Sequence, residues 1–338
     1  MKLSLDQIRS ITQGASRIEE KNGYISFCRF NKKEEDLYSK TEFFRKTFST
    51  AGIQFEFMTD GEFLNLNFRT STATTRTYFA IDVFVNGKKI NSIKNFDDSI
   101  KDTDYISTEF VLGDYNSKVD LGKGIKTVKI VFPWSVKTEI GEVEIENATY
   151  VESVKKDKKI IMYGDSITNG YDALYPSETY AVKLADFLNA ELFNKAIGGE
   201  IFFPQLAEIK NDLKPDYITV AYGTNDWAIS EQSDFKNHCR EFFEALIHNY
   251  SDTDIFSITP IWRSNFELEK KFGDFSDVEK IIKSICSDYK RITVITGWDL
   301  VPHSEKYYAD SRVHPNDEGF ECYSENLIKE FKKMQGGI

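Results

Sequence analysis

The spacing of apolar residues divides the chain into two parts. From Tyr24 to about Val151, apolar and polar residues mostly alternate, as in Ile53-Gln54-Phe55-Glu56-Phe57. Turn-forming residues separate these runs, and the Asn86-Gly87 pair is typical of a tight hairpin. Alternation with period two predicts antiparallel strands, and we expect them to form a jelly-roll-like β-sandwich of two sheets.

The second part has a different pattern of apolar residues, which begins after the basic stretch Lys155 to Lys159. Short apolar runs there alternate with amphipathic segments, among them Ser177–Asn189, with Ser177 as its expected N-cap, and Asp234–Asn249. The predicted strands are Ile160–Tyr163, Glu191–Lys195, Tyr217–Tyr222, Ile255–Thr259 and Ile292–Thr296. Such alternation predicts an α/β fold, a doubly wound parallel sheet with helices on both faces. We therefore expect a β-sandwich domain over residues 1–153 and an α/β domain over residues 154–338.

Composition narrows the class of protein. The 338 residues are 41% hydrophobic and carry a net charge of -11, which argues against a nucleic-acid partner because phosphate binding needs a basic surface. The first residues lack the apolar core of a signal peptide, and no window approaches the roughly 18 apolar residues of a membrane span. The four cysteines show no metal-binding spacing, so we expect buried free thiols and a cytoplasmic location.

Four short motifs carry the candidate chemistry: YGDSIT, NKAIGGE, AYGTND and DSRVHPND. The first three follow predicted strands, and reactive groups collect beyond the carboxyl ends of strands in such a sheet. Ser166 could act as a nucleophile, while its backbone N–H, that of Gly199 and the Asn225 amide could bind an oxyanion. Taken singly, each motif could equally be a structural turn or a helix cap.

A serine hydroxyl needs a base to attack an ester at neutral pH, and histidine is the usual one. Of the four histidines, His314 has the most conspicuous context, because Pro315 and Asn316 follow it. His238 and His248 lie on a predicted helix and are expected at the surface. His303 is a weaker alternative base.

The ordered set of motifs, over about residues 159–335, resembles the SGNH hydrolase superfamily of GDSL esterases and lipases. The resemblance implies a three-layer, flavodoxin-like sheet and a serine esterase that needs no metal or cofactor. It also implies that Ser166 is the nucleophile, that His314 is the base, and that Ser166, Gly199 and Asn225 form the oxyanion hole. The pattern G-x-S-x-G is absent because Thr168 occupies its last position, which disfavours an ordinary α/β-hydrolase.

One departure from the family pattern concerns the acid of the triad. The family acid usually precedes the histidine by three residues, where this chain has Ser311, and Asp310 lies four residues before His314. Either the loop holds one extra residue and Asp310 reaches Nδ1 of His314, or a backbone carbonyl orients a Ser–His dyad. We favour Asp310, because a carboxylate stabilises the imidazolium.

The remaining hypotheses concern the substrate. Trp262 and Arg263 follow the fourth predicted strand and Trp227 follows the third motif, so all three could contact a sugar; core packing or an ion pair is the alternative. A β-sandwich before an SGNH domain resembles certain carbohydrate esterases, which suggests O-acetylated sugars or oligosaccharides as substrates. The rival functions are a lysophospholipase or thioesterase on the same scaffold, and a non-catalytic carbohydrate-binding protein. No spacing of metal ligands supports a metal phosphoesterase.

Overall fold

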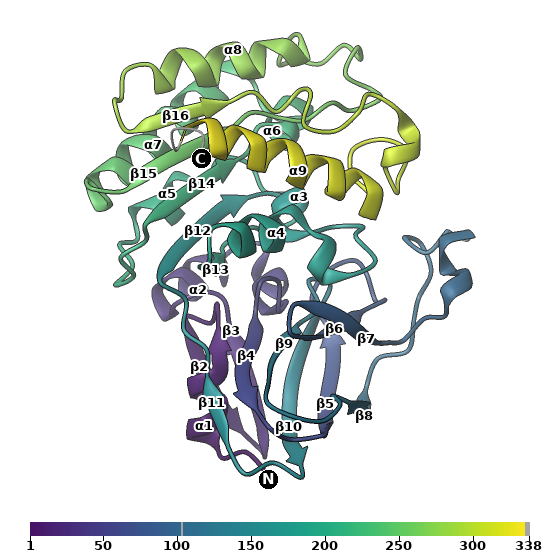
Figure 1. Ribbon diagram of the computed structural model, residues 1–338. Helices are drawn as coiled ribbons and strands as arrows, with labels where there is room; N and C mark the ends of the chain where they lie inside the picture. Colours follow the sequence, from purple (N-terminus) through teal and green to yellow (C-terminus); the bar gives the residue numbers. More distant parts are fainter. Residues whose placement is uncertain (103, 335–338) are drawn as a thin grey trace.

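The computed structural model describes residues 1–102 and 104–334, and it contains an N-terminal β-sandwich below a parallel α/β layer (Figure 1). One sandwich sheet has the order β1-β4-β9-β6-β7, with β11 also paired to β4. Its strands are β1 (Thr12–Gln13), β4 (Gln54–Thr59), β6 (Ala80–Val85), β7 (Lys88–Lys94), β9 (Lys126–Val131) and β11 (Val151–Ser153). The other sheet has the order β2-β3-β10-β5-β8, formed by β2 (Arg17–Lys21), β3 (Tyr24–Cys28), β5 (Phe63–Thr72), β8 (Asp114–Asp120) and β10 (Val136–Glu146). The short helices of this part are α1 (Leu5–Ile11), α2 (Lys32–Tyr38), η1 (Phe44–Phe48) and η2 (Asp98–Asp102).

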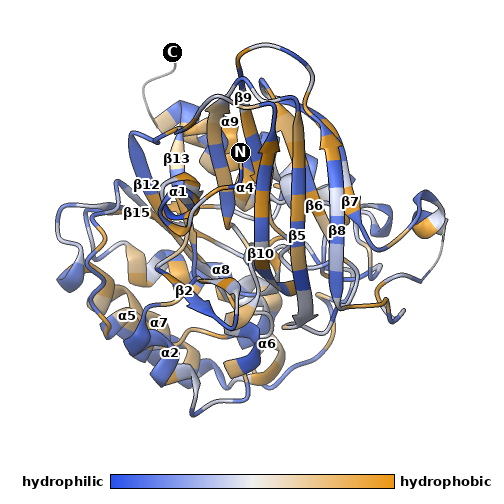
Figure 2. Ribbon diagram, turned by 90° about the horizontal axis from the view of Figure 1, so that it is seen from below, coloured by the Kyte–Doolittle hydropathy of each residue, from blue (hydrophilic) through white to orange (hydrophobic). Residues whose placement is uncertain are grey.

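The sandwich follows from the alternating pattern of its strands. Apolar side chains of both sheets meet in one buried core, and bands of high and low hydropathy alternate along β5 and β10 (Figure 2). The predicted hairpin joins β6 to β7, and Asn86 and Gly87 adopt φ values of 49° and 77°. Two consecutive left-handed residues are what a type I′ turn requires, so the prediction from this pair is confirmed.

The C-terminal part contains a five-stranded parallel sheet of order β13-β12-β14-β15-β16, the flavodoxin-like order. Its strands are β12 (Lys158–Gly164), β13 (Ala190–Asn194), β14 (Tyr217–Ala221), β15 (Asp254–Ile258) and β16 (Ile292–Ile295). The helices are α3 (Ser166–Asn169), η3 (Pro176–Glu178), α4 (Tyr180–Phe187), α5 (Pro204–Glu208), α6 (Thr224–Ile229), α7 (Gln232–Asn249), α8 (Phe275–Cys286), η4 (Glu305–Tyr307) and α9 (Asp317–Met334). Helices α4 and α9 pack on one face of the sheet, and α5, α7 and α8 pack on the other. The predicted fold class is therefore confirmed.

Two details differ from the sequence-based expectations. Ser177 does not cap a helix: helix α4 begins at Tyr180 after Thr179, and the Ser177 hydroxyl donates to Asp82 Oδ2 at 2.6 Å. The buried Asp82 carboxylate also accepts the Ser177 N–H, so this serine serves the contact between the two parts of the chain. All four cysteines are free thiols, but only Cys239 and Cys286 are buried, whereas Cys28 and Cys322 are half-buried.

Buried charges fix the sandwich against the parallel sheet. The Arg29 side chain is fully buried and donates to the carbonyls of Ser49, Asn194 and Ala196 at 2.8–2.9 Å. Lys195 pairs with Glu34 at 2.6 Å, and both side chains are inaccessible to solvent. Breaking a buried pair leaves an uncompensated charge, so these contacts favour one relative placement of the two parts.

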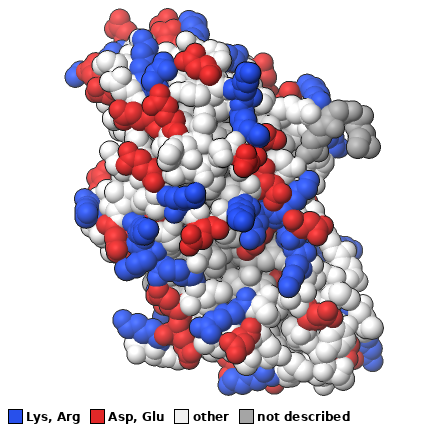
Figure 3. Space-filling view, turned by 90° about the vertical axis from the view of Figure 1, so that its left-hand side faces the viewer, with Lys and Arg blue, Asp and Glu red and all other residues white. Residues whose placement is uncertain are grey.

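On the face drawn in Figure 3, acidic and basic side chains are interspersed over both parts of the protein. Within the described ranges, no helix is both long and apolar enough to cross a bilayer.

Candidate active site

Three motif residues meet at the carboxyl edge of the parallel sheet. Ser166 follows the end of β12, Gly199 lies on the loop after β13, and Asn225 lies at the start of α6 after β14. Because β12 lies between β13 and β14, the three loops are neighbours. The Asp165 side chain caps the turn that begins at Ser166 by accepting the Ile167 N–H at 2.9 Å.

His314 contacts the serine directly. Its Nε2 lies 2.8 Å from Ser166 Oγ, within hydrogen-bond distance, and the hydroxyl donates to this nitrogen when the imidazole is neutral. The Ser166 residue is 6% exposed, and the His314 side chain is 16% exposed. A nucleophile and a base in hydrogen-bond contact are the arrangement that activates a serine.

The candidate oxyanion donors lie on the loops after the neighbouring strands. Gly199 has a φ of 89°, and a Cβ atom placed on it would meet nothing closer than Lys46 Nζ at 3.5 Å and Phe43 Cε1 at 3.6 Å. A ligand can therefore approach its backbone closely. The Asn225 amide donates to the Glu200 carbonyl at 2.9 Å, which holds this side chain next to the Gly199 loop.

The loop before His314 contains the extra residue that the sequence suggested. Ser311 adopts a φ of 52°, in the left-handed region, and the chain turns back toward Asp310. One Asp310 oxygen accepts the backbone N–H groups of Arg312, Val313 and His314 at 2.8–3.0 Å. The other oxygen lies 3.1 Å from His314 Nδ1, so the structure brings Asp310 to the base.

A second carboxylate, Asp172, reaches the same nitrogen, and sequence reasoning missed it. Asp172 Oδ2 lies 3.1 Å from His314 Nδ1, and its side chain is fully buried. Arg76 from the sandwich donates two hydrogen bonds to this carboxylate, Nε to Oδ1 at 2.7 Å and Nη2 to Oδ2 at 3.1 Å. Asp172 lies outside the four motifs, and Arg76, which binds it, is 96 positions away in the sequence. The spacing of residues along the chain therefore could not identify Asp172 as part of the site.

These contacts change the acid–base properties of the site. Burial alone would lower the pKa of His314, but hydrogen bonds and charges from Asp172 and Asp310 outweigh it and raise that pKa to about 9. Burial alone would raise the pKa of Asp310, whereas its hydrogen bond to His314 holds that pKa below the ordinary value. The pKa of Asp172 is lowered in the same way. The three groups therefore favour an imidazolium between two carboxylates.

The atoms of Asp172, Asp310 and His314 that could bind a metal ion lie within 4.8 Å of one another. Both oxygens of Asp172 already accept hydrogen bonds from Arg76, and Nε2 of His314 faces the serine. This arrangement suits a shared proton at Nδ1 better than a second cation, because Arg76 already supplies the positive charge.

The predicted substrate contacts are mostly enclosed by protein. Trp227, Trp262 and Arg263 are 0%, 9% and 7% exposed, respectively. Arg263 lies over the Trp227 ring at 4.9 Å and donates to the carbonyl and hydroxyl of Thr224, while Trp262 stacks on His303. Arg263 thus supports the turn that carries Asn225, and direct substrate contact by these three residues stays a prediction.

The other histidines lie apart from the serine contact. His303 is exposed and its Nε2 lies 2.9 Å from the Trp298 carbonyl. His248 is exposed as predicted, whereas His238 is half-buried on α7.

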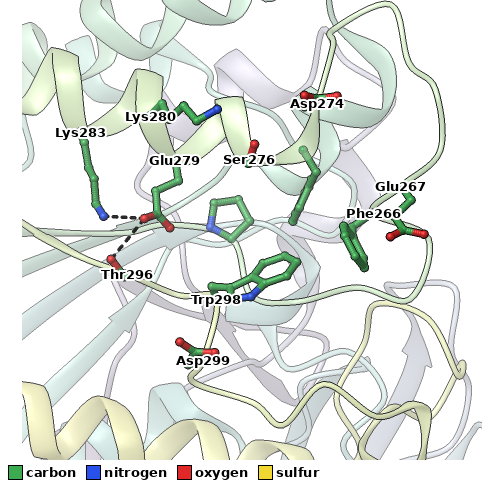
Figure 4. A pocket seen from close by; sticks show the side chains of 12 residues that line it. Phe266, Glu267, Asp274, Ser276, Glu279, Lys280, Lys283, Thr296, Trp298 and Asp299 are labelled. Carbon is green, nitrogen blue, oxygen red and sulfur yellow. Dashed lines mark hydrogen bonds and ion pairs between the residues drawn. The ribbon is translucent and has the colours of Figure 1, made fainter.

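A cavity of about 660 Å³ lies at the carboxyl ends of β15 and β16, beside α8 (Figure 4). Its apolar lining comprises Pro260, Phe266, Phe275 and Trp298. Its charged lining is mixed and is labelled in Figure 4: Glu267, Asp274, Glu279, Lys280, Lys283 and Asp299. A Cβ atom on Gly223 would lie 3.0 Å from Pro260, so Pro260 lies between the cavity and the Gly223–Asn225 turn. Volumes of this size accommodate small ligands.

Comparisons with known proteins agree with this geometry. Residues 162–322 match the GDSL-like Lipase/Acylhydrolase family, a range that includes Ser166, Gly199, Asn225 and His314. No curated protein matches the sequence at a significant level.

Solved structures share the whole two-part architecture. A salicylyl-acyltransferase, SsfX3, from a tetracycline biosynthetic pathway has a TM-score of 0.80 at 20% identity, over 96% of this chain and 94% of that one. A family two carbohydrate esterase from Clostridium thermocellum, in complex with cellohexaose, has a TM-score of 0.66 at 14% identity, over 97% and 100% of the two chains. An acetyl xylan esterase, Est2A, from Butyrivibrio proteoclasticus has a TM-score of 0.63 at 14% identity, over 100% and 98%. At these identities the likeness shows a shared fold.

The predicted resemblance to the SGNH superfamily is thereby confirmed. Residues 162–322 form a GDSL-like lipase/acylhydrolase domain, and the protein is a carboxylic ester hydrolase.

Proposed function

We propose that the protein is a serine esterase that works through an acyl-enzyme and removes acetyl groups from O-acetylated sugars or oligosaccharides. The observation that carries the mechanism is the contact of 2.8 Å between Ser166 Oγ and His314 Nε2, at the strand edge that also holds Gly199 and Asn225. The convergence of these strand ends on the Ser166–His314 contact supports the roles proposed for the four residues.

The proposed reaction has two halves. Ser166 Oγ bonds to the ester carbonyl carbon while its proton passes to His314 Nε2. The backbone N–H groups of Ser166 and Gly199 and the Asn225 amide bind the oxyanion of the tetrahedral intermediate. The carbon–oxygen bond to the sugar then breaks, and His314 returns the proton to the departing alkoxide. Water attacks the acyl-enzyme in the same way, giving a carboxylic acid and free Ser166.

The substrate class rests on two supports. One structure with this architecture is named a carbohydrate esterase and holds cellohexaose, and another is named an acetyl xylan esterase. In addition, the cavity beside the Asn225 turn combines the aromatic rings of Phe266 and Trp298 with carboxylates. Aromatic rings pack against the C–H faces of sugars, and carboxylates accept hydrogen bonds from hydroxyl groups. This cavity is where we place the sugar part of the ester.

Rapid-mixing kinetics with p-nitrophenyl acetate test the mechanism. We expect a burst of nitrophenol of about one equivalent per enzyme, because acylation of a good ester outpaces hydrolysis of the acyl-enzyme. Ser166→Ala should lose about 10⁶-fold in kcat, as for serine nucleophiles elsewhere. Ser287→Ala is the matched control, because this exposed serine lies at the end of α8. The absence of a burst together with full activity of Ser166→Ala would rule out the mechanism.

A substrate panel tests the specificity separately. We expect acetylated xylo- and cello-oligosaccharides to be better substrates than p-nitrophenyl esters with acyl chains longer than acetyl. A rate that rises with acyl length would instead support the lysophospholipase or thioesterase hypothesis. Binding of glycans without turnover would support the non-catalytic carbohydrate-binding hypothesis.

A further inference from the structure

The loop that carries Asp172 is shaped by the sandwich domain. The loop lies between α3 and η3, and three sandwich side chains bind it: Arg76 through the Asp172 carboxylate, Tyr105 through the Asp172 carbonyl at 3.0 Å, and Trp134 through the Ala173 carbonyl at 2.9 Å. All three donors come from loops that leave or approach sandwich strands. The position of this loop therefore depends on the other domain.

The backbone of Asp172 is held in an uncommon conformation. Its φ is 71°, in the left-handed region, which is sterically disfavoured for residues that have a side chain. Such conformations persist only where the surroundings determine them, and they cluster at functional sites. Here the conformation accompanies a fully buried carboxylate whose Oδ2 faces His314 Nδ1 at 3.1 Å.

We propose that Asp172 is a second carboxylate partner of the base His314, and that the β-sandwich positions it through Arg76. This inference rests on the proposed function for the role of His314. Asp310 and Asp172 approach the same ring nitrogen from different loops, so the positive charge that forms on His314 during attack lies between two anions. Two carboxylates this close repel each other, and the guanidinium of Arg76 offsets that repulsion.

The charged groups around His314 are few enough to give a clear expectation. Asp165, which caps α3, Asp172 and Asp310 act on the imidazole, and Arg76 acts through Asp172. The ring of Tyr171 also packs against the imidazole, with ring centroids 5.7 Å apart. Removal of the Asp172 charge takes away one stabilising contact of the imidazolium, so the pKa of His314 should fall. A purely structural role for Asp172 would leave that pKa unchanged.

The experiment compares Asp172→Asn, Arg76→Met and the double variant with the wild type. At a pH above the pKa of His314, where the imidazole is neutral in every variant, we expect each single variant to lose about 10²-fold in kcat/KM, the effect of a base misplaced by about 1 Å. In the double variant the loss should equal that of Asp172→Asn alone, because Arg76 acts through Asp172. Asp172→Asn combined with Asp310→Asn should lose about 10⁴-fold, as for triads without a functional acid. Arg76→Lys should recover part of the activity.

Two further measurements keep the test independent of folding and of turnover. Arg69→Met is the control for folding, because Arg69 pairs with Asp114 at 2.8 Å on an exposed part of the sandwich. NMR titration of the His314 ring in Asp172→Asn should show a lowered pKa, a result that does not depend on whether Ser166 is the nucleophile. An unchanged His314 titration with more than half of the wild-type kcat/KM would overturn the proposal. Additive losses in the Arg76/Asp172 double variant would overturn the role of Arg76.

Discussion

The two sides of the proposed catalytic centre are held in different ways. On the oxyanion side, Ser166, Gly199 and Asn225 follow adjacent strands of one sheet. On the base side, His314 and its carboxylates lie on two loops, and one of these loops is held by the sandwich domain. The oxyanion side therefore starts from three adjacent strand ends, and the sandwich touches it through backbone carbonyls of the Gly199 loop, which Arg29 and Lys46 bind. On the base side the sandwich instead binds a carboxylate that contacts His314.

This difference follows from the chemistry of each side. Oxyanion donors are neutral amides, and they need no carboxylate beside them to act. A base that becomes cationic needs anions nearby, and buried anions need a counter-charge of their own. In this protein the fully buried Asp172 receives that counter-charge from Arg76, which provides a physical reason for the sandwich to adjoin the site.

The largest change that we expect on the oxyanion side comes from Asn225→Ala. Loss of one oxyanion donor costs about 2.7–4 kcal/mol in transition-state stabilisation, or about 10²–10³ in kcat. Asn249→Ala is the matched control, because its amide also donates to a backbone carbonyl, at 2.8 Å, but on α7. Steady-state kinetics with p-nitrophenyl acetate measure both. Equal activity of the two variants would show that Asn225 does not donate to the oxyanion.

The base side should be recognisable by its pH dependence. Only neutral His314 accepts the serine proton, and the pKa of His314 is raised to about 9. Below that pH the neutral fraction falls, so kcat/KM should rise up to about tenfold for each pH unit as the pH approaches 9. Asn225→Ala should lower this curve without moving it, whereas Asp172→Asn should move its acid limb to lower pH. A wild-type plateau that begins near pH 6.5 would contradict the two-carboxylate environment.

The smallest effect is expected from the cavity beside the oxyanion side. Trp298→Ala removes an aromatic wall, a contact worth about 0.5–1.5 kcal/mol, and should raise KM for acetylated oligosaccharides by at most about tenfold. The same variant should hydrolyse p-nitrophenyl acetate normally, because that ester has no sugar. Trp298→Phe keeps an aromatic ring and serves as the control. An equal loss on both substrates would mean that Trp298 supports the fold rather than the sugar.

The comparison also explains which features the sequence could predict. Strand-end positions follow from periodicity, so the predicted strands and the placement of Ser166, Gly199 and Asn225 at one edge agree with the structure. The sequence could not decide whether Asp310 or a backbone carbonyl contacts Nδ1 of His314. The left-handed turn at Ser311 brings Asp310 back to that nitrogen, and this turn was not predictable from the spacing. Asp172 could not be predicted at all, since its position depends on Arg76, Tyr105 and Trp134 in another domain.

Trp227 and Arg263 illustrate a second limit of the sequence. Both lie just beyond strand ends, as predicted, yet they pack on each other in the interior instead of on an open surface. Position along the chain indicated the correct edge of the sheet. It did not indicate which side chains at that edge face a ligand, because that depends on the loops packed above them.

The most direct measurement of the central claim is the identity of the acylated residue. Enzyme quenched with acid during turnover of p-nitrophenyl acetate can be digested and its peptides analysed by mass spectrometry. The account predicts one acetyl group on Ser166, in the peptide that spans the end of β12 and α3, and none in Ser166→Ala. An acetyl group on another residue, or its absence while the wild-type enzyme turns over under conditions that give a nitrophenol burst, would contradict it.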